Sequence, residues 1–223
     1  NALSSVIDFR MIEPNKDKWG YRATLGATDL GFTANGPVSK NSGLIFSVRR
    51  SYLQFLFDVI GLPFLPVYND LQFKYKWNIN KKNQLTFIGL GAIDNNSLNT
   101  GIENPDESQQ YILGYLPENK QWSYTVGAVY KHFSTNGFHQ LVLSRNALNN
   151  KAFKYQDNIV EDSLRTFDYN STETENKLRY EFIGTKNGWN YEYGAGLQLS
   201  NFTDNTFQKQ FIDGNVQDFN RKA

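Results

Sequence analysis

Apolar and polar side chains alternate with a period of two along several segments of the chain. In residues 71–79 the odd positions are Leu, Phe, Tyr, Trp and Ile, whereas the even positions are Gln, Lys, Lys and Asn. Residues 189–200 repeat this pattern. Such alternation predicts β-strands with one apolar face and one polar face. The other segments with the pattern are 21–28, 121–131 and 177–182, together with the less regular 44–51, 85–93 and 138–145.

Helical periodicity is weak throughout the chain. Only residues 160–165 are expected to form a short helical turn, inside a loop. The sequence therefore predicts an all-β protein with about nine visible strands.

The connections between the expected strands alternate between short and long. Two of the short connections contain Asn-Gly, which supplies the positive φ values of two-residue hairpin turns. The alternation predicts an antiparallel up-and-down sheet with tight turns at one edge and long loops at the other. Transmembrane β-barrels show this asymmetry, with short periplasmic turns and long extracellular loops. The short connections are 36–42, 80–83, 134–137 and 186–188, and the long ones are 57–68, 95–121 and 146–174.

A soluble β-sandwich or lipocalin-like barrel is the alternative, because any half-buried antiparallel sheet alternates. Strictly alternating loop lengths are not expected of Greek-key sandwiches. Trp and Tyr residues also lie near the ends of the expected strands, where a membrane barrel places aromatic rings at the headgroup level. Both features favour the transmembrane barrel. The aromatic pairs are Trp19 with Tyr21, Tyr75 with Trp77, Trp122 with Tyr124, and Trp189 with Tyr191.

Composition agrees with strands that have one apolar face. Aromatic residues make up 15% of the 223 residues, although only 39% are hydrophobic. The net charge of +1 provides no basic field for nucleic acid, and the absence of cysteine excludes disulfides and thiol chemistry. No stretch approaches the roughly 18 apolar residues of a membrane helix. The chain begins at Asn1 without a signal peptide, so we expect an excerpt or a processed product.

No catalytic, cofactor or metal site is expected. His132 and His139 are the only histidines; they could face each other across a tight turn, but no third metal ligand is evident. Ser134 near His132 and Ser144 near His139 lack the motif of a catalytic nucleophile. Two acidic groups lack the spacing of a known calcium loop, and we expect them to be solvated surface. These groups are Glu103, Asp106 and Glu107, and Asp157, Glu161 and Asp162.

Charged residues on the polar parity of the expected strands are candidates for contact with a lumenal plug or a solute. Arg50 lies instead on the apolar parity, where an arginine at mid-depth of a bilayer costs about 2–4 kcal/mol. We therefore expect Arg50 near the outer rim, close to the loop that begins at Phe57. The lumen-facing candidates are Arg49, Lys74, Lys76, Lys131, Lys177, Arg179, Glu181 and Glu192.

Three stretches resemble TonB-dependent receptors of the Bacteroidetes: Ser-Val-Arg-Arg-Ser-Tyr at 47–52, Gly-Leu-Pro-Phe-Leu-Pro at 61–66, and Leu-Thr-Phe-Ile-Gly-Leu-Gly-Ala-Ile-Asp at 85–94. Residues 1–9 resemble the end of the plug domain of such a receptor, and residues 19–35 its first barrel hairpin. The resemblance implies that residues 1–14 end the plug and that residues 15–223 are the N-terminal strands and loops of a transmembrane β-barrel. Such barrels have roughly 22 strands around a plug, so we expect an incomplete fragment.

The resemblance also implies a function in the bacterial outer membrane. A receptor of this kind is not an enzyme; energy-coupled displacement of its plug admits a solute, which the sequence does not identify. The implied partners are outer-membrane lipid, the remainder of the protein's own barrel and plug, and the TonB energy-coupling complex. The alternative is a barrel subunit with a structural or binding role, partnered by a surface lipoprotein or a larger envelope complex. A barrel-type outer-membrane enzyme is a third reading.

Overall fold

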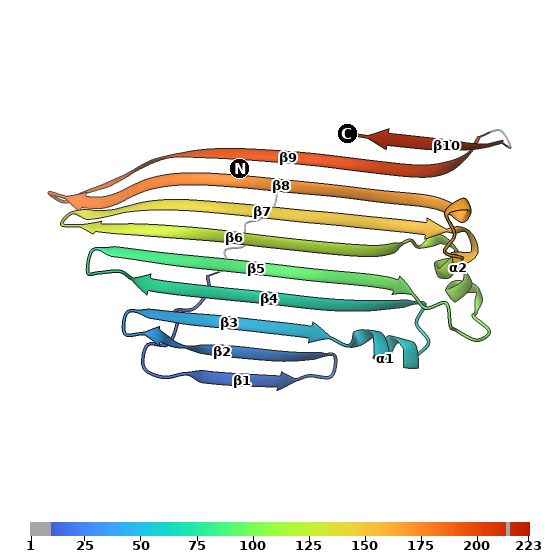
Figure 1. Cartoon of the computed structure of the whole chain (residues 1–223), viewed down its shortest axis with the longest axis horizontal. Helices are drawn as coiled ribbons and strands as arrows, with labels where there is room; N and C mark the ends of the chain where they lie inside the picture. Colours follow the sequence, from blue (N-terminus) through green and yellow to red (C-terminus); the bar gives the residue numbers. More distant parts are fainter. Residues whose placement is uncertain (1–9, 213–214) are drawn as a thin grey trace.

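Ten strands form one antiparallel sheet, and their order in space is their order in the chain (Figure 1). The computed structural model describes residues 10–212 and 215–223. In this part of the chain the outer strands β1 and β10 are not paired with each other, so the sheet is open. The up-and-down topology is confirmed. The strands are β1 (Gly20–Leu25), β2 (Asp29–Ser39), β3 (Ser42–Ser51), β4 (Phe64–Asn78), β5 (Asn83–Leu98), β6 (Glu118–Ser134), β7 (Gly137–Tyr155), β8 (Arg165–Lys186), β9 (Trp189–Ile212) and β10 (Asn215–Lys222).

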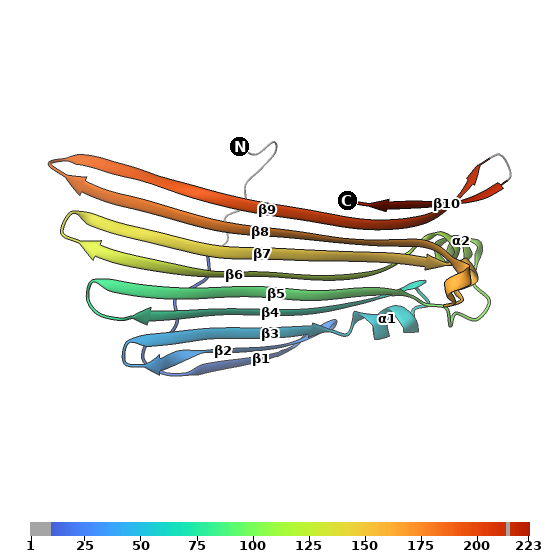
Figure 2. The same ribbon diagram turned by 45° about the horizontal axis from the view of Figure 1, so that its top comes forward.

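Three of the connections at one end of the sheet are longer than any at the other end, and residues 26–28 between β1 and β2 are a short exception at the longer end. At the end that we call the turn end, four connections have only two to four residues: 40–41, 79–82, 135–136 and 187–188. The opposite loop end carries α1 (Leu53–Val59), α2 (Glu107–Tyr115) and the short 3-10 turns Gln156–Asn158 and Asp162–Leu164. Figure 2 shows both helices at this one end of the sheet. The predicted asymmetry and the short helical turn within 160–165 are confirmed, whereas neither helix was predicted.

The expected loop 146–174 is largely strand, and the expected loop 95–121 is strand for four residues at each end, which corrects the prediction. Strands β5 and β6 leave only residues 99–117 outside the sheet, and β7 and β8 leave only 156–164. The strand count is ten rather than nine, because the polar segment after Asn201 completes β9 and a further strand follows it. These strand ends carry polar residues on both faces, so the period-two pattern disappears there although the backbone pairing continues.

The longest strands, β7, β8 and β9, are much longer than a membrane requires. β9 has 24 residues and is therefore roughly 80 Å long at about 3.3 Å per residue. A tilted strand crosses a bilayer with only about 9–11 residues. The polar halves of β7, β8 and β9 therefore extend well beyond any hydrocarbon layer, toward the loop end.

The two tight turns that contain Asn-Gly use it differently. Asn187 and Gly188 have φ values of 53° and 80°, as a two-residue hairpin requires. In the 134–137 turn, Thr135 and Asn136 have no positive φ, so that part of the prediction is wrong. Glycine is needed at position 137 because the backbone of β8 lies close to it: a Cβ there would lie 2.3 Å from the carbonyl oxygen of Ile183.

The strand register divides the side chains between two faces. The polar face contains Lys74 and its ladder neighbours, such as Ile45 and Lys177, and the segment before β1 lies across it. The aromatic face contains the alternate positions, such as Phe73 and Leu143. All eight aromatic residues expected near strand ends belong to the aromatic face. A ladder row is a set of residues directly opposite one another on successive strands. One row on this face consists of Tyr21, Ala34, Phe46, Phe73, Gly89, Val126, Arg145, Asn176 and Leu199.

The described residues do not enclose a hydrophobic core. Their buried hydrophobic residues are Ala34, Ile45, Leu98 and Ala147, and no large side chain is fully buried. On the aromatic face Leu197 keeps 59% of its surface exposed. A single sheet layer with so much exposed apolar surface needs an apolar medium or a partner against it. No helix in the described part of the chain is long and apolar enough to cross a membrane.

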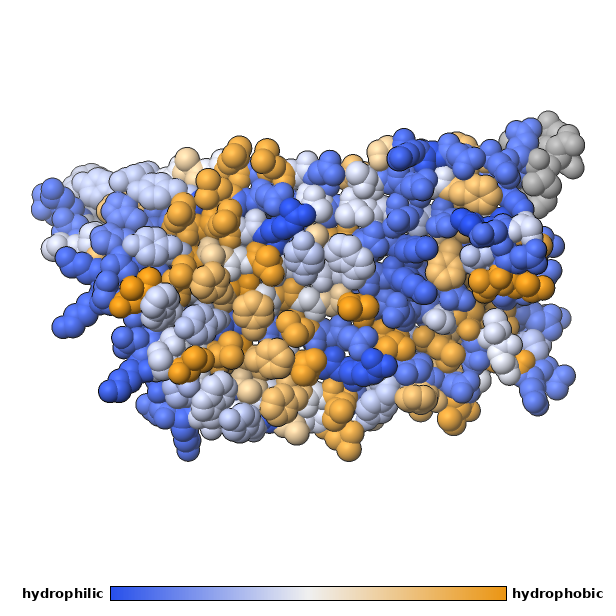
Figure 3. Space-filling view, in the orientation of Figure 1, coloured by the Kyte–Doolittle hydropathy of each residue, from blue (hydrophilic) through white to orange (hydrophobic). Residues whose placement is uncertain are grey.

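The apolar band on the aromatic face runs obliquely across the strands. In the ladder row that joins Leu199 to Tyr21, Leu199 is the last apolar residue of β9 before the polar Asn201, whereas Tyr21 is near the start of the apolar run of β1. Figure 3 shows the orange atoms toward the turn end at β8 and β9 and shifted toward the loop end at β1 to β3. A barrel wall has this property, because its strands tilt by roughly 35–45° from the barrel axis.

The oblique band predicts that arginine substitutions at two positions of one ladder row lower the free energy of unfolding by different amounts. Phe32 and Asn201 belong to the same row, but only Phe32 lies within the band. In the full-length protein folded into phosphatidylcholine vesicles, we expect Phe32→Arg and Leu197→Arg to lower the free energy of unfolding by about 2–4 kcal/mol and Asn201→Arg by about 0–1 kcal/mol. Urea titration measures these values. If Phe32→Arg and Asn201→Arg lowered the free energy of unfolding equally, the apolar band would follow the ladder rows and its oblique course would be contradicted.

Candidate functional site

A segment that precedes β1 is fixed to the polar face by two lysines of β4. The ammonium group of Lys74 donates to Glu13 Oε1 at 2.8 Å and to the carbonyl oxygens of Met11 and Ile12, each at 3.2 Å. Lys76 Nζ lies 2.6 Å from Glu13 Oε2. Lys74 is only 7% exposed, so its charge is compensated almost entirely by this segment. In Figure 1 the segment passes behind the sheet, on the side away from the aromatic face.

Close backbone approach holds the same segment against β2 and β3. The amide of Asn15 donates to Asn35 Oδ1 at 2.7 Å. Pro14 is buried and lies over Gly43, where an added Cβ would lie 2.7 Å from the Pro14 Cβ. Glycine at position 43 therefore allows the segment to contact the sheet backbone.

The two lysines keep Glu13 ionised. Burial by itself would raise the pKa of the Glu13 carboxyl, but the hydrogen bonds and charges of Lys74 and Lys76 outweigh burial and hold the pKa below its ordinary value. A lowered carboxyl pKa means that the attachment is present at neutral pH and is lost only as the pH falls through that lowered pKa. Because Glu13 is 59% exposed, solvent screens this contribution and each ion pair is weak.

All eight lumen-facing candidates belong to the polar face, but the structure gathers them into separate groups. Arg49 lies 2.8 Å from Asp70 and 3.6 Å from Asp29. Lys74 and Lys76 share Glu13. Lys131 lies over the ring of Phe138 at 4.9 Å.

The remaining four candidates lie on β8 and β9. Lys177 is paired with Glu175 at 2.8 Å and Arg179 with Glu181 at 3.0 Å. Glu192 lines a shallow open cleft of about 360 Å³ with Arg179 and Glu181. Apart from Glu13, the acidic partners of the candidates are half-buried, and the groups do not converge on one enclosed pocket.

Sequence reasoning missed the acidic partners Glu13 and Asp70. Asp70 could have been found, because it continues the even, polar parity of residues 71–79 by one position. Glu13 lies in a segment without periodicity, and nothing local indicates that it contacts residues more than 60 positions later.

The loop-end connections are tied to one another by side chains that bind backbone carbonyls. Asn99 Nδ2 donates to Asp58 Oδ1 at 3.0 Å and to the Leu62 carbonyl at 3.2 Å. Gln109 of α2 donates to the Gly61 carbonyl at 2.8 Å. Lys154 of β7 and Asn158 both donate to the Leu113 carbonyl of α2, with Asn158 Nδ2 at 3.1 Å. The connections 52–63, 99–117 and 156–164 therefore form one linked rim.

The nucleophile candidates are not arranged for catalysis. Ser144 belongs to the polar face and His139 to the aromatic face, so the sheet separates them. Ser134 donates to the Gly137 carbonyl within its turn at 2.9 Å. His132 and His139 are paired across strands with ring centroids 6.2 Å apart; His132 contacts Asn83 at 2.8 Å and His139 contacts the Tyr180 hydroxyl at 2.7 Å.

The acidic loop residues have local structural roles. Asp106 caps α2 and accepts from the Gln109 amide at 2.8 Å. Asp162 pairs with Arg165, and Glu161 accepts from Ser163 at 2.6 Å. Across the described ranges, no group of three potential ligand residues could hold a metal ion.

Comparison with known proteins identifies the architecture. No protein-family model matches the chain, and no curated protein matches it. Two solved structures are similar, and both are variants of the ferric enterobactin receptor PfeA from Pseudomonas aeruginosa, each 14% identical. Their TM-scores are 0.50 and 0.51; they cover 86% and 85% of this chain, and the chain spans 30% of each receptor. The sheet therefore has the fold of part of the barrel wall of a TonB-dependent receptor.

Proposed function

We propose that the chain is part of the wall of an outer-membrane receptor that takes up a solute with energy from a TonB complex. The observation that carries the proposal is the segment of residues 10–15, which crosses the polar face and is held there by Lys74 and Lys76. In a plugged barrel the chain must enter the first strand from inside the lumen. Residues 1–14 then end the plug; of these, residues 1–9 lie outside the described residues.

The two faces support this role. The aromatic face meets lipid, and the polar face with its eight charged candidates meets the plug and the solute. The long polar strand ends and the linked rim at the loop end lie outside the cell, where a solute first arrives. The resemblance at residues 47–52, 61–66 and 85–94 supports the proposal that the receptor is of the kind found in the Bacteroidetes.

Energy-coupled uptake predicts accumulation that depends on the proton-motive force. Cells that lack the gene and cells that express the full-length protein are given labelled ferric enterobactin, the cargo named for the similar receptors, or labelled cobalamin or an oligosaccharide. We expect at least one solute to accumulate only in the expressing cells, and a protonophore to return accumulation to background. Binding without protonophore-sensitive accumulation of any of the three would favour a structural or binding subunit.

The position of the plug end predicts a disulfide. Because the chain has no cysteine, Pro14→Cys with Gly43→Cys introduces a unique pair whose Cβ atoms are near the roughly 3.5–4.5 Å of a disulfide after a small shift. We expect the pair to oxidise in the full-length protein in membranes, detected by loss of maleimide labelling that a reductant restores. Pro14→Cys with Gly196→Cys on β9 is the control and should stay reduced; equal oxidation of both pairs would contradict the placement.

The sidedness of the barrel predicts which connections antibodies reach. An epitope tag inserted at Asn104 lies in the 99–117 connection at the loop end, and a tag at Asn187 lies at the turn end. On intact cells we expect antibody to label the Asn104 tag, and to label the Asn187 tag only after the outer membrane is permeabilised. The reverse labelling would invert the proposed topology.

A further inference from the structure

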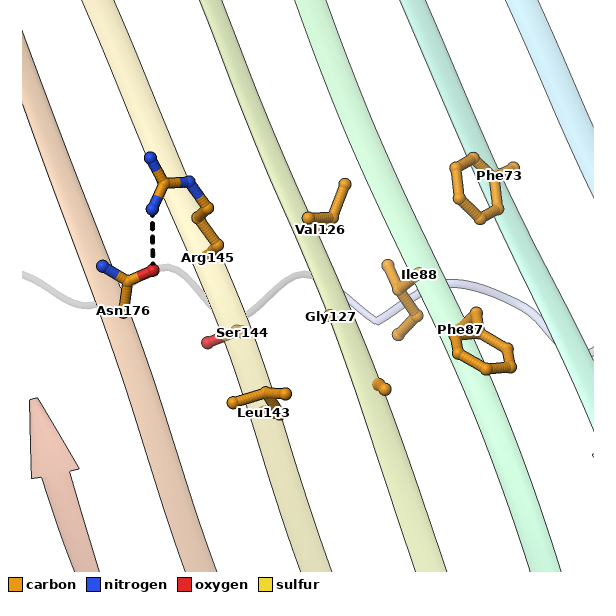
Figure 4. Close-up of a pocket in the computed structure, with 10 residues that line it drawn as sticks. Phe73, Phe87, Ile88, Val126, Gly127, Leu143, Ser144, Arg145 and Asn176 are labelled. Carbon is orange, nitrogen blue, oxygen red and sulfur yellow. Dashed lines mark hydrogen bonds between the residues drawn. The ribbon is translucent and has the colours of Figure 1, made fainter.

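Two arginines lie on the aromatic face, and both are held by neutral partners. Arg145 Nε lies 3.0 Å from the Tyr124 hydroxyl, and its Nη1 donates to Asn176 Oδ1 at 2.9 Å (Figure 4). Arg50 Nη1 donates to Asn69 Oδ1 at 2.9 Å. In each case the arginine and the asparagine are directly opposite each other on neighbouring strands. The arrangement therefore occurs twice on one face.

The charge of these two guanidinium groups is not neutralised by the protein. In the part of the chain that the structure describes, neither Arg50 nor Arg145 forms an ion pair, whereas Arg49 and Arg179 on the polar face pair with carboxylates. Asparagine and tyrosine orient a guanidinium group without cancelling its charge. Since arginine has five N–H donors, each group retains donors for an anion.

An apolar groove begins beside Arg145. The groove has a volume of about 340 Å³, at the lower end of the range for small-molecule sites. Ala128 lies on one rung of the ladder between Phe87 and Leu143, so a small side chain forms the floor between two large ones. Figure 4 shows Arg145 beyond Leu143, on the side of Asn176. The groove is therefore apolar along its length and cationic at its loop-side end.

A second apolar groove begins at the Arg50–Asn69 pair; Asn69 lines it and Arg50 lies next to it, whereas Arg145 lines the first groove directly. The volume of the second groove is about 410 Å³, and Asn69, the partner of Arg50, lines its end. Gly91 forms the floor on a rung between Leu71 and Tyr124. Arg50 and Arg145 lie at the loop-side edge of the apolar band, and from there both grooves extend into the band. The edge of the band is the level at which a membrane places its headgroups.

We propose that the two grooves bind anionic membrane lipids whose headgroup carries a phosphate, with an acyl chain in the groove and the phosphate on Arg50 or Arg145. Charge complementarity selects this occupant, because a guanidinium group binds phosphate oxygens through paired N–H donors. A zwitterionic headgroup competes poorly, since its own cation already lies beside its phosphate. The inference rests on the membrane placement under the proposed function and is independent of uptake.

Native mass spectrometry of the full-length protein in detergent tests the assignment. Dioleoylphosphatidylglycerol is the anionic probe, and dioleoylphosphatidylcholine, with the same acyl chains, is the neutral one. We expect phosphatidylglycerol to bind preferentially at two sites. Arg50→Gln and Arg145→Gln should each weaken one site about tenfold, as the loss of a charge-assisted hydrogen bond implies. The double variant should lose the preference, and Ala128→Phe should close one groove.

Matched controls and separate outcomes make the test decisive. Arg22→Gln removes a cation from the polar face, and Ala23→Phe enlarges a side chain on the aromatic face of β1 outside both grooves; neither should change lipid binding. No preference in the wild type, an unaltered double variant, or an equal loss in the controls would overturn the proposal. Failure of the protein to insert into phosphatidylcholine vesicles would remove the membrane placement as well, whereas insertion without lipid preference would overturn this inference alone.

Discussion

The structure depends on the fact that its ten strands form a single layer, with no second layer of helices or strands against either face among residues 10–212 and 215–223. Backbone groups are satisfied by strand pairing, but the side chains of the aromatic face have no protein partner in the described residues, and Leu197 and Leu143 remain more than half exposed. In water such a surface is unfavourable by roughly 25 cal/mol per Å² of apolar area. A hydrocarbon surrounding removes that penalty, and the period-two alternation then leaves the polar face to water and to the chain's own N-terminal segment. Topology, composition and charge distribution all follow from this constraint.

The oblique course of the apolar band follows from the same constraint together with strand tilt. Lipid defines a level that is perpendicular to the barrel axis, whereas the hydrogen-bonded ladder follows the tilted strands. A residue such as Phe32 therefore belongs to the band although its ladder partner several strands away, Asn201, does not. Arg50 and Arg145 lie on the aromatic parity but at the loop-side edge of the band, where a charge is far less costly than at mid-depth.

The sequence predicts those parts of the fold that hydrocarbon controls. In the proposed membrane placement, residues 71–77 alternate strictly because lipid and water act on opposite faces, and the parity of Arg50 follows from the same pattern. Beyond the band both faces meet water, so the polar halves of β8 and β9 carry no alternation and the sequence predicts loops there. Helix α2 had a local signal, because Asp106 and Gln109 form a capping box. Helix α1 had none, since Tyr52 provides no side-chain cap. Glu13 could not be assigned to Lys74, because only the folded sheet brings them together.

The sheet and the segment that crosses its polar face are held by contacts of different strength. The wall is held by continuous backbone pairing over strands of up to 24 residues, and its loop-end connections are fixed to each other by Asn99, Gln109 and Lys154. The crossing segment is held by side-chain contacts around Glu13, and exposed ion pairs of this kind contribute roughly 0–1 kcal/mol each. Lys74 is the exception, because its nearly buried ammonium group loses its partners if the segment leaves. If the segment is displaced, the Lys74 ammonium group must be solvated by water or by another hydrogen-bond acceptor.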